Sequence, residues 1–299
     1  YIWHNILVRQ FNWNEVQLRQ WRCTAAMAAS HALPRSLEDV STALELDIQK
    51  DMEGKRTMLK LSKPRRPSKT NPSTWHEKQE DYNILYEYCK QDVEVERLIY
   101  KTLRPLNKKE QEIWFLDQKI NMRGVQIDVH GAEDALFMIE KYKNECEKEV
   151  TILTDSYLHN VNQINRTKDW IKSQGVDMPN MTKSTVSHII ANCKLPDNVR
   201  RLLEIRQQLS KTSTKKYQAL NIATDINGRL RDLLLYHAAS TGRWGGRMFQ
   251  PQNLPRGNVQ NIEECIRALG THDIHKFKNL YPDVMGAISS CIRGMIVAK

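Results

Sequence analysis

The sequence predicts an α/β protein that is mainly α-helical and contains two domains. Apolar residues recur at helical spacing over most of the chain, and only short segments have the character of strands. The chain has 299 residues, which is enough for two domains. Its 40% hydrophobic and 27% charged residues are typical of a folded globular protein and exclude disorder as the default.

A helix is predicted over residues 36–47, because Ser36 is a suitable N-cap and Glu38 and Asp39 fall in the first turn. Residues 54–78 contain three prolines and many Lys and Arg, so we expect an exposed basic loop. That loop is either a solvated linker or a segment that contacts a DNA strand.

Residues 80–103 predict an amphipathic helix that carries Tyr88 and Asp92. Their i, i+4 spacing places phenol and carboxylate on one face. There the carboxylate can hold a divalent metal and the phenol can orient a water molecule. On composition alone, such a pair is more often structural than catalytic.

Residues 108–128 predict a helix that ends at Gly124 and a short strand after it. Further helical patterns cover residues 131–159, 183–193 and 196–220. In residues 259–299, the spacing of the isoleucines near the end indicates a buried helix that leads toward a sheet.

Positive charge is concentrated between residues 200 and 247, where ten Lys and Arg face three acidic residues, in a chain whose net charge is +10. With a pI near 9.3, this favours a polyanionic partner. Nucleic acid is preferred over a membrane because no basic amphipathic anchor is evident. The alternative to a nucleic-acid contact is that residues 200–220 form a helical face that is simply solvated.

Residues 243–253 supply hydrogen-bond donors suited to the minor groove of duplex DNA. In that groove every base pair offers acceptors at nearly equivalent positions. Lysines of residues 211–216 would contact phosphates. The predicted DNA-binding residues are Arg206, Lys211, Thr212, Lys215, Lys216, Arg243, Arg247, Gln250, Gln252 and Asn253.

Other classes of protein are disfavoured. The six cysteines form no CxxC pair and have no His partner at zinc-finger spacing, so neither a disulfide framework nor a zinc site is expected. No window approaches eighteen apolar residues, and the first ten residues lack the order of a signal peptide. We therefore expect a cytoplasmic protein, in the host cell if the protein is viral.

The wording LEIRQQLSKTSTKKY, YHAASTGRW and FQPQNLPR resembles the stretch before the first palm motif of family A (polymerase I-type) DNA polymerases, in their bacteriophage branch. The resemblance implies a DNA-directed DNA polymerase for replication, with primer–template DNA, dNTPs and Mg²⁺. It implies that Arg243 contacts the minor groove at the primer terminus. Gln252 and Asn253 would hold the template–primer near the insertion site, and Arg293 is a candidate for a phosphate contact or a core-capping residue.

The run from Tyr88 to Asp92 resembles the third motif of the 3′–5′ exonuclease domain that precedes the polymerase in this family. This implies catalytic roles for both residues and a metal-ligand role for Asp92. Asn5 resembles the second motif, but Arg9 stands where that motif has an acidic residue. Two-metal hydrolysis needs several carboxylates, so the exonuclease region is expected to be degenerate or incomplete.

By this resemblance, residues 1–104 form part of an RNase H-like exonuclease domain, and residues 105–299 form the thumb and the start of the palm. The catalytic aspartates of the family's palm are not in this sequence, so the chain alone is expected to be inactive in polymerisation. An alternative is a complete DNA-binding subunit of a split polymerase, with the catalytic palm and fingers on a second polypeptide.

Overall fold

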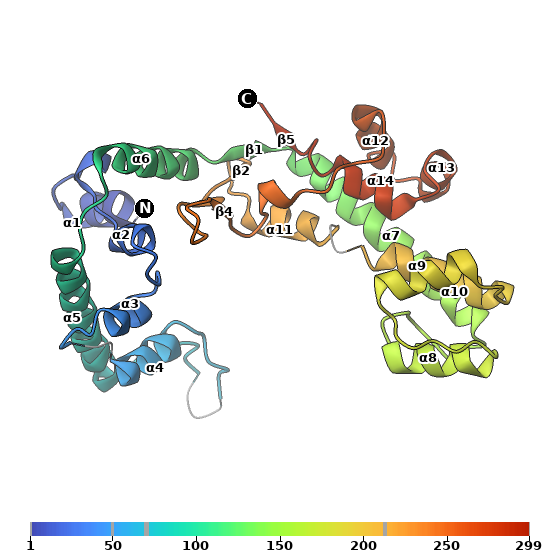
Figure 1. Ribbon diagram of the computed structural model, residues 1–299, viewed down its shortest axis with the longest axis horizontal. Coiled ribbons are helices and arrows are strands. Elements are labelled where there is room, and N and C mark those ends of the chain that lie inside the picture. Colours follow the sequence, from blue (N-terminus) through green and yellow to red (C-terminus); the bar gives the residue numbers. More distant parts are fainter. Residues whose placement is uncertain (1, 49–50, 69–71, 212–213, 299) are drawn as a thin grey trace. The chain divides into compact units, whose positions relative to one another are not determined.

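The chain forms two compact units that are mainly helical (Figure 1). The computed structural model describes residues 2–48, 51–68, 72–211 and 214–298. One unit comprises residues 1–120 with 234–245, and the other comprises residues 121–233 with 246–299. The predicted domain boundary after residue 104 lies just before the helix in which the chain passes from the first unit to the second. The functional division into domains is a separate matter and stays a prediction.

The first unit is built from short helical elements around two long helices. Its elements are η1 (Trp3–Val8), α1 (Arg9–Phe11), η2 (Leu18–Gln20), α2 (Thr24–Ser30), α3 (Leu37–Ala43), α4 (Met52–Leu61), α5 (Gln79–Thr102) and the larger part of α6 (Lys108–Arg123). A hairpin of β3 (Leu234–Leu235) and β4 (Gly245–Gly246) returns the chain to the second unit. The described part of residues 1–104 contains no strand, so an RNase H-like fold stays a prediction for it.

Helix α5 organises the first unit, because α2, α3 and α4 all pack on it. Its apolar face buries Val95 and Ile99 against Met27 of α2 and Val40 of α3. The predicted cap of α3 is confirmed, since the Asp39 amide donates a 3.1 Å hydrogen bond to the Ser36 hydroxyl.

Part of the predicted loop at residues 54–78 is wrong, because α4 continues to Leu61. The first proline comes only at Pro64, and Asp51 caps the helix by accepting from the Glu53 amide at 2.9 Å. The helix packs closely on α5, since a Cβ at Gly54 would lie 2.5 Å from the Tyr88 Cβ. The prolines therefore exclude a helix only in the later part of this segment. The residues before Pro64 form a helix that packs on α5.

The second unit holds the remaining helices and a small antiparallel sheet. Its elements are β1 (Val125–Ile127), α7 (Val129–Leu153), α8 (Ile164–Ser173), α9 (Lys183–Asn192), α10 (Asp197–Leu209), α11 (Lys215–Ala223), β2 (Arg229–Leu230), η4 (Pro251–Asn253), α12 (Ile262–Leu269), α13 (Ile274–Leu280), α14 (Val284–Cys291) and β5 (Ile296–Val297).

The sheet has the strand order β2-β1-β5, with Val125 opposite Leu230 and Ile127 opposite Ile296. The predicted helix end at Gly124 and the strand after it are confirmed, and Gly124 has the positive φ of 66° that glycine adopts without strain. The predicted helix leading to a sheet near the end of the sequence is also confirmed, as α14 and β5.

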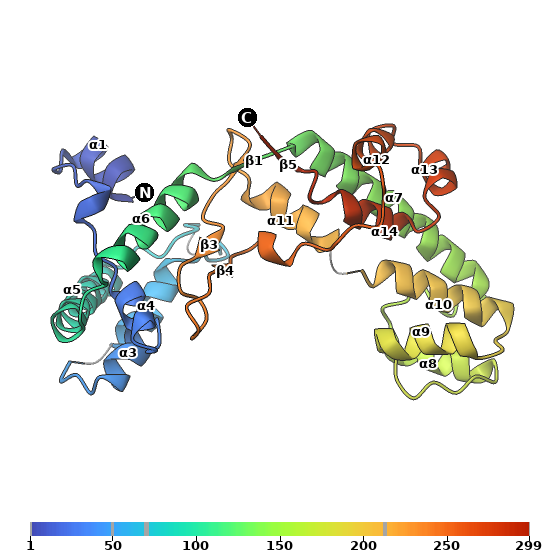
Figure 2. The ribbon, with the colours of Figure 1, turned by 45° about the horizontal axis from the view of Figure 1, so that its top comes forward.

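Helix α7 is the central helix of the second unit, and α10, α11, α12 and α14 contact it (Figure 1). Figure 2 shows α8, α9 and α10 together near one end of α7. Tyr217 of α11 is fully buried and donates a 2.7 Å hydrogen bond to the Ile288 carbonyl of α14. The core thus fixes α11 relative to α14.

Two predicted helices of this unit differ from the structure. The pattern over 131–159 ends at Leu153, where Thr154 turns the chain by bonding the Val150 carbonyl. The pattern over 196–220 is two helices, since α10 ends at Leu209 and α11 begins at Lys215. Ser210 and Thr214, which flank the two helices, are residue types that compete for backbone hydrogen bonds and disfavour a helix interior. The helix α8 was not predicted.

All six cysteines are free thiols. Among the helices of the described residues, none combines the length and apolar character that crossing a bilayer requires.

Candidate nucleic-acid interface

Residues 250–253, here called the QPQN turn, lie at the surface of the second unit beside a buried anchor. Phe249 is fully buried, whereas Gln250, Gln252 and Asn253 are exposed. Met248 and Gln250 both have positive φ, near 48° and 49°. The chain therefore bends sharply on either side of Phe249, so that the aromatic ring points inward and the amides face solvent.

Two basic side chains hold the backbone on both sides of the QPQN turn. The Lys216 ammonium of α11 donates to the carbonyl oxygens of Phe249 at 2.5 Å and of Gln250 at 3.4 Å. The Arg293 guanidinium donates to the Leu254 carbonyl at 2.9 Å and the Pro255 carbonyl at 3.0 Å. These contacts tie the turn to α11 and to the residues that follow α14.

The Lys216 contact differs from the phosphate contact that the sequence predicts for it. Its ammonium lies 5.5 Å from the Phe249 ring centroid, and burial lowers its pKa from the ordinary value. Arg293 likewise donates to backbone carbonyls, a structural contact that is similar to the core-capping role considered for it above. In this structure both cations position the turn, and contact of either with DNA stays a prediction.

The exposed amides of the turn are arranged by one another. The Asn253 side-chain amide donates a 3.1 Å hydrogen bond to the Gln250 Oε1, and the Asn253 backbone amide donates to the Gln250 carbonyl at 3.0 Å. Side-chain amides offer both donors and acceptors, and their donors suit the acceptors of a minor groove. The structure thus brings together the three amide residues that the sequence singled out.

The other predicted contacts of the second unit lie in different settings. Lys215 is exposed at the first turn of α11. Arg247 forms an ion pair with both carboxylate oxygens of Asp232, each at 2.7 Å. Lys211 forms an ion pair with Asp283 at 2.5 Å. Thr212 lies outside the described residues.

Arg206 is partly buried on α10, where its guanidinium donates to the Val161 carbonyl at 2.6 Å and to the Met181 carbonyl at 3.4 Å. Burial lowers its pKa from the ordinary value. This side chain joins α10 to two loops of the same unit. A phosphate contact for it stays a prediction.

Arg243 belongs to the first unit. It is exposed, and its carbonyl accepts a 3.2 Å hydrogen bond from the Ala239 amide, which closes the turn that contains Thr241 and Gly242. The predicted DNA-binding set is therefore shared between the two units.

Tyr88 and Asp92 lie one turn apart on α5, as predicted. Tyr88 is 5% exposed because it packs beneath Gly54 of α4, and Asp92 is half-buried. Within the described residues, no three His, Cys, Asp or Glu side chains lie close enough together to hold a metal ion. The residues present therefore do not fit a Mg²⁺ site, and we derive no hydrolytic step for them.

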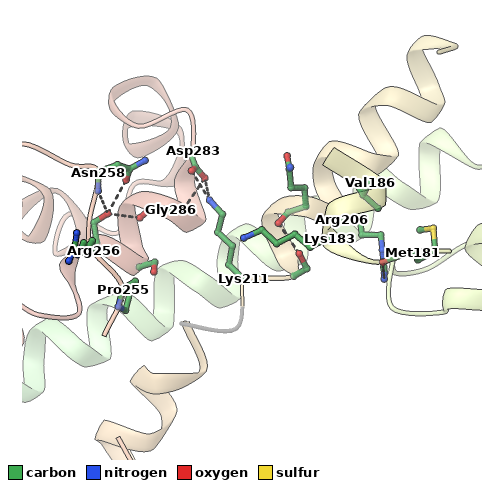
Figure 3. A pocket seen from close by; sticks show the side chains of 14 residues that line it. Met181, Lys183, Val186, Arg206, Lys211, Pro255, Arg256, Asn258, Asp283 and Gly286 are labelled. Carbon is green, nitrogen blue, oxygen red and sulfur yellow. Dashed lines mark hydrogen bonds and ion pairs between the residues drawn. The ribbon is translucent and has the colours of Figure 1, made fainter. Parts of the chain in front are cut away.

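The sequence reasoning missed a basic pocket of about 620 Å³ in the second unit (Figure 3). It is lined by Lys183, Arg206, Lys211 and Arg256 together with Asp283, Asn258 and several hydroxyls. Of its four cations, the sequence predicts DNA contacts for Arg206 and Lys211. Arg256 stands in the LPRG wording next to the QPQN turn, which was the available signal for it.

Comparison with known proteins supports a relationship to DNA polymerases. No family model matches the chain. The chain is 36% identical over 284 residues to the DNA polymerase of Bacillus phage SP02. The match covers 92% of this chain and 43% of that polymerase, so the chain spans less than half the length of the relative.

Proposed function

We propose that this chain is part of a DNA-directed DNA polymerase of phage type and that it binds primer–template DNA during replication. The observation that carries the proposal is the 36% identity to a phage DNA polymerase over 92% of the chain. The net charge of +10 and its concentration in residues 200–247 support a polyanionic ligand.

The QPQN turn supports the mode of binding. Lys216 and Arg293 fix its backbone, so Gln250, Gln252 and Asn253 face solvent on a rigid support. Preorganised amides lose little conformational freedom on binding, and minor-groove acceptors have nearly the same positions in all base pairs. We infer that the turn contacts the minor groove of the primer–template without reading its sequence.

Finer assignments follow from the resemblance to family A. We propose that residues 105–299 form the thumb and the start of the palm and that residues 1–104 derive from a proofreading exonuclease domain. Arg243 then contacts the primer–template. The dNTPs and Mg²⁺ are proposed as substrates and cofactor of the complete polymerase.

The test is binding of the chain to fluorescein-labelled primer–template duplexes of three unrelated sequences, followed by fluorescence anisotropy across a range of NaCl concentrations. We expect similar affinities for the three sequences. The logarithm of the binding constant should fall linearly with the logarithm of salt concentration, by about 0.9 for each phosphate neutralised.

Binding that is absent at low salt would reject the proposal. Affinities that differ by orders of magnitude between the sequences would reject the minor-groove mode. A single-stranded template of the same length serves as the control, because it lacks the paired minor groove and should bind more weakly.

A further inference from the structure

The basic pocket lies between the α9–α10 region and the beginning of α14 (Figure 3). Four cationic side chains and one carboxylate line it: Lys183, Arg206, Lys211, Arg256 and Asp283. Hydroxyl and amide groups of Ser210, Ser290 and Asn258 add neutral hydrogen-bonding partners. An excess of positive charge with convergent donors is the chemistry of an anion site.

The four cationic side chains differ in whether they already have hydrogen-bond or ion-pair partners within the protein. Arg206 donates to two backbone carbonyls, and Lys211 is paired with Asp283. Over the part of the chain that the structure describes, the Lys183 ammonium and the Arg256 guanidinium have no hydrogen-bond or ion-pair partner. Two cations are thus available to an incoming anion, and a third can become available if its ion pair opens.

The Lys211–Asp283 ion pair closes one side of the pocket. The Lys211 ammonium lies 2.5 Å from Asp283 Oδ1 and 2.6 Å from Oδ2, and Figure 3 shows the lysine reaching across to the carboxylate. The contact needs space at Gly286, where a Cβ would lie 2.8 Å from the Lys211 Nζ. Two anionic oxygens on one ammonium is also the contact that a phosphate would make.

Asp283 has a second partner on its own helix. Its Oδ1 accepts a 3.0 Å hydrogen bond from the Gly286 amide and so caps α14. Burial by itself raises the pKa of this carboxyl, but the Lys211 ammonium and the Gly286 amide outweigh burial and hold the pKa below its ordinary value. The carboxylate is therefore charged at neutral pH and competes with other anions for Lys211.

Exchange of partners is open to this pair because solvent reaches it. The Lys211 side chain is 25% exposed and the Asp283 side chain is 43% exposed. Ion pairs with this much solvent contact are weak. A polyanion that releases counterions on binding can therefore compete with Asp283 for the lysine.

We propose that this pocket binds a phosphate of the nucleic-acid backbone and that Asp283 occupies Lys211 in place of that phosphate until DNA binds. The inference rests on the proposed function and adds to it a residue that weakens binding. Lys183 and Arg256 attract the strand, and Lys211 exchanges the carboxylate for the phosphate. Asp283 then acts as an internal competitor that sets the affinity of the protein for DNA.

The test compares Asp283→Asn with wild type in the anisotropy assay with labelled primer–template. Asparagine removes the charge and still caps a helix well, so α14 should remain folded. We expect Asp283→Asn to bind DNA about two- to fivefold more tightly, the range that follows from the strength of exposed ion pairs. Thermal unfolding by circular dichroism checks that the variant is folded.

The matched control is Asp273→Asn. Asp273 caps α13 in the same unit by accepting from the Lys276 amide at 3.0 Å, and it does not line the pocket. This variant removes the same charge from the same kind of position, so it reports the effect of net charge alone. Lys211→Gln should weaken binding and reduce the salt slope by about one, because it removes one phosphate contact.

Equal affinities of Asp283→Asn and Asp273→Asn would overturn the inference and leave the proposed function standing. Failure of every protein, wild type included, to bind DNA would instead reject the proposed function. Inorganic pyrophosphate, titrated by calorimetry, distinguishes the source of the phosphate. If Asp283→Asn gained affinity for pyrophosphate and none for DNA, the site would take nucleotide phosphates, and the backbone assignment would be wrong.

Discussion

The ammonium of Lys216 lies 2.5 Å from the carbonyl oxygen of Phe249 and joins α11 to the residue that anchors the QPQN turn. The two residues are 33 positions apart in the sequence. Lys216 lies in a basic run for which the sequence predicts phosphate contacts, but in the structure its ammonium holds the backbone of Phe249. This contact also makes the placement of Gln250, Gln252 and Asn253 depend on a residue of another element.

The first prediction concerns that contact. Lys216→Met keeps the length of the side chain over the Phe249 ring but removes the charged donor. We expect the free energy of unfolding to fall by about 1.5–3 kcal/mol, as for hydrogen bonds to charged groups. Primer–template affinity should fall as well. Urea unfolding and fluorescence anisotropy measure the two effects.

Lys215→Met is the matched control, since Lys215 is the exposed neighbour and loses the same charge. It should weaken DNA binding without changing the free energy of unfolding. If both variants lost the same affinity and neither lost stability, Lys216 would act only through its charge.

Arg243 provides the second prediction. Arg243→Ala should weaken binding to primer–template about tenfold or more, since a hydrogen bond from a charged donor contributes about 1.5–3 kcal/mol. The loss should be the same for unrelated DNA sequences, because the turn is proposed to read none. Arg97→Ala, which removes an exposed arginine of α5, is the control at matched salt. Unchanged affinity of the Arg243 variant would disprove its role.

The third prediction addresses the exonuclease-like pair. Because the described residues bring no three His, Cys, Asp or Glu side chains together around Asp92, we expect no Mg²⁺- or Mn²⁺-dependent degradation of labelled single-stranded DNA by this chain. Degradation that is lost in Asp92→Ala would contradict this expectation and support the metal-ligand role that the resemblance implies. The measurement is product length on a denaturing gel. Equal degradation by both proteins would show that the activity comes from elsewhere, and Glu94→Ala, an exposed position on the same helix, is the control.

The fourth prediction is a dependence of stability on pH. The pKa of Asp283 is lower in the folded protein than the unfolded value near 3.9. Its contribution to stability is therefore present above that value and is lost as the pH falls through the folded pKa. The stability advantage of wild type over Asp283→Asn should be constant near neutral pH and should shrink below about pH 4.

Urea unfolding of both proteins from pH 7 down to pH 3 measures this difference. A gap that stayed constant over the whole range would show that the Asp283 carboxylate does not contribute through its charge. The Asp273→Asn protein is not a neutral reference here, because hydrogen bonds from nearby backbone amides also lower the pKa of Asp273.

Several elements could be predicted from the sequence because local interactions fix them. The Ser36 cap, the periodicity of α5 and the glycine that ends α6 each involve residues within about one helical turn, and the structure has all three. The concentration of positive charge and the cluster of amide residues near residue 250 are likewise properties of the sequence alone. They were sufficient to indicate a nucleic-acid ligand.

The tertiary structure decided which charged side chains form ion pairs and which residues are their partners. Lys211 pairs with Asp283, which is 72 positions away in the sequence, and Arg247, although exposed, pairs with Asp232. Helical periodicity cannot specify such partners, because they are set by how α10, α11 and α14 pack together around buried residues such as Tyr217 and Phe249. The sequence determined that this surface is basic, and the packing of distant helices determined which of its cations hold the protein together and which remain for a ligand.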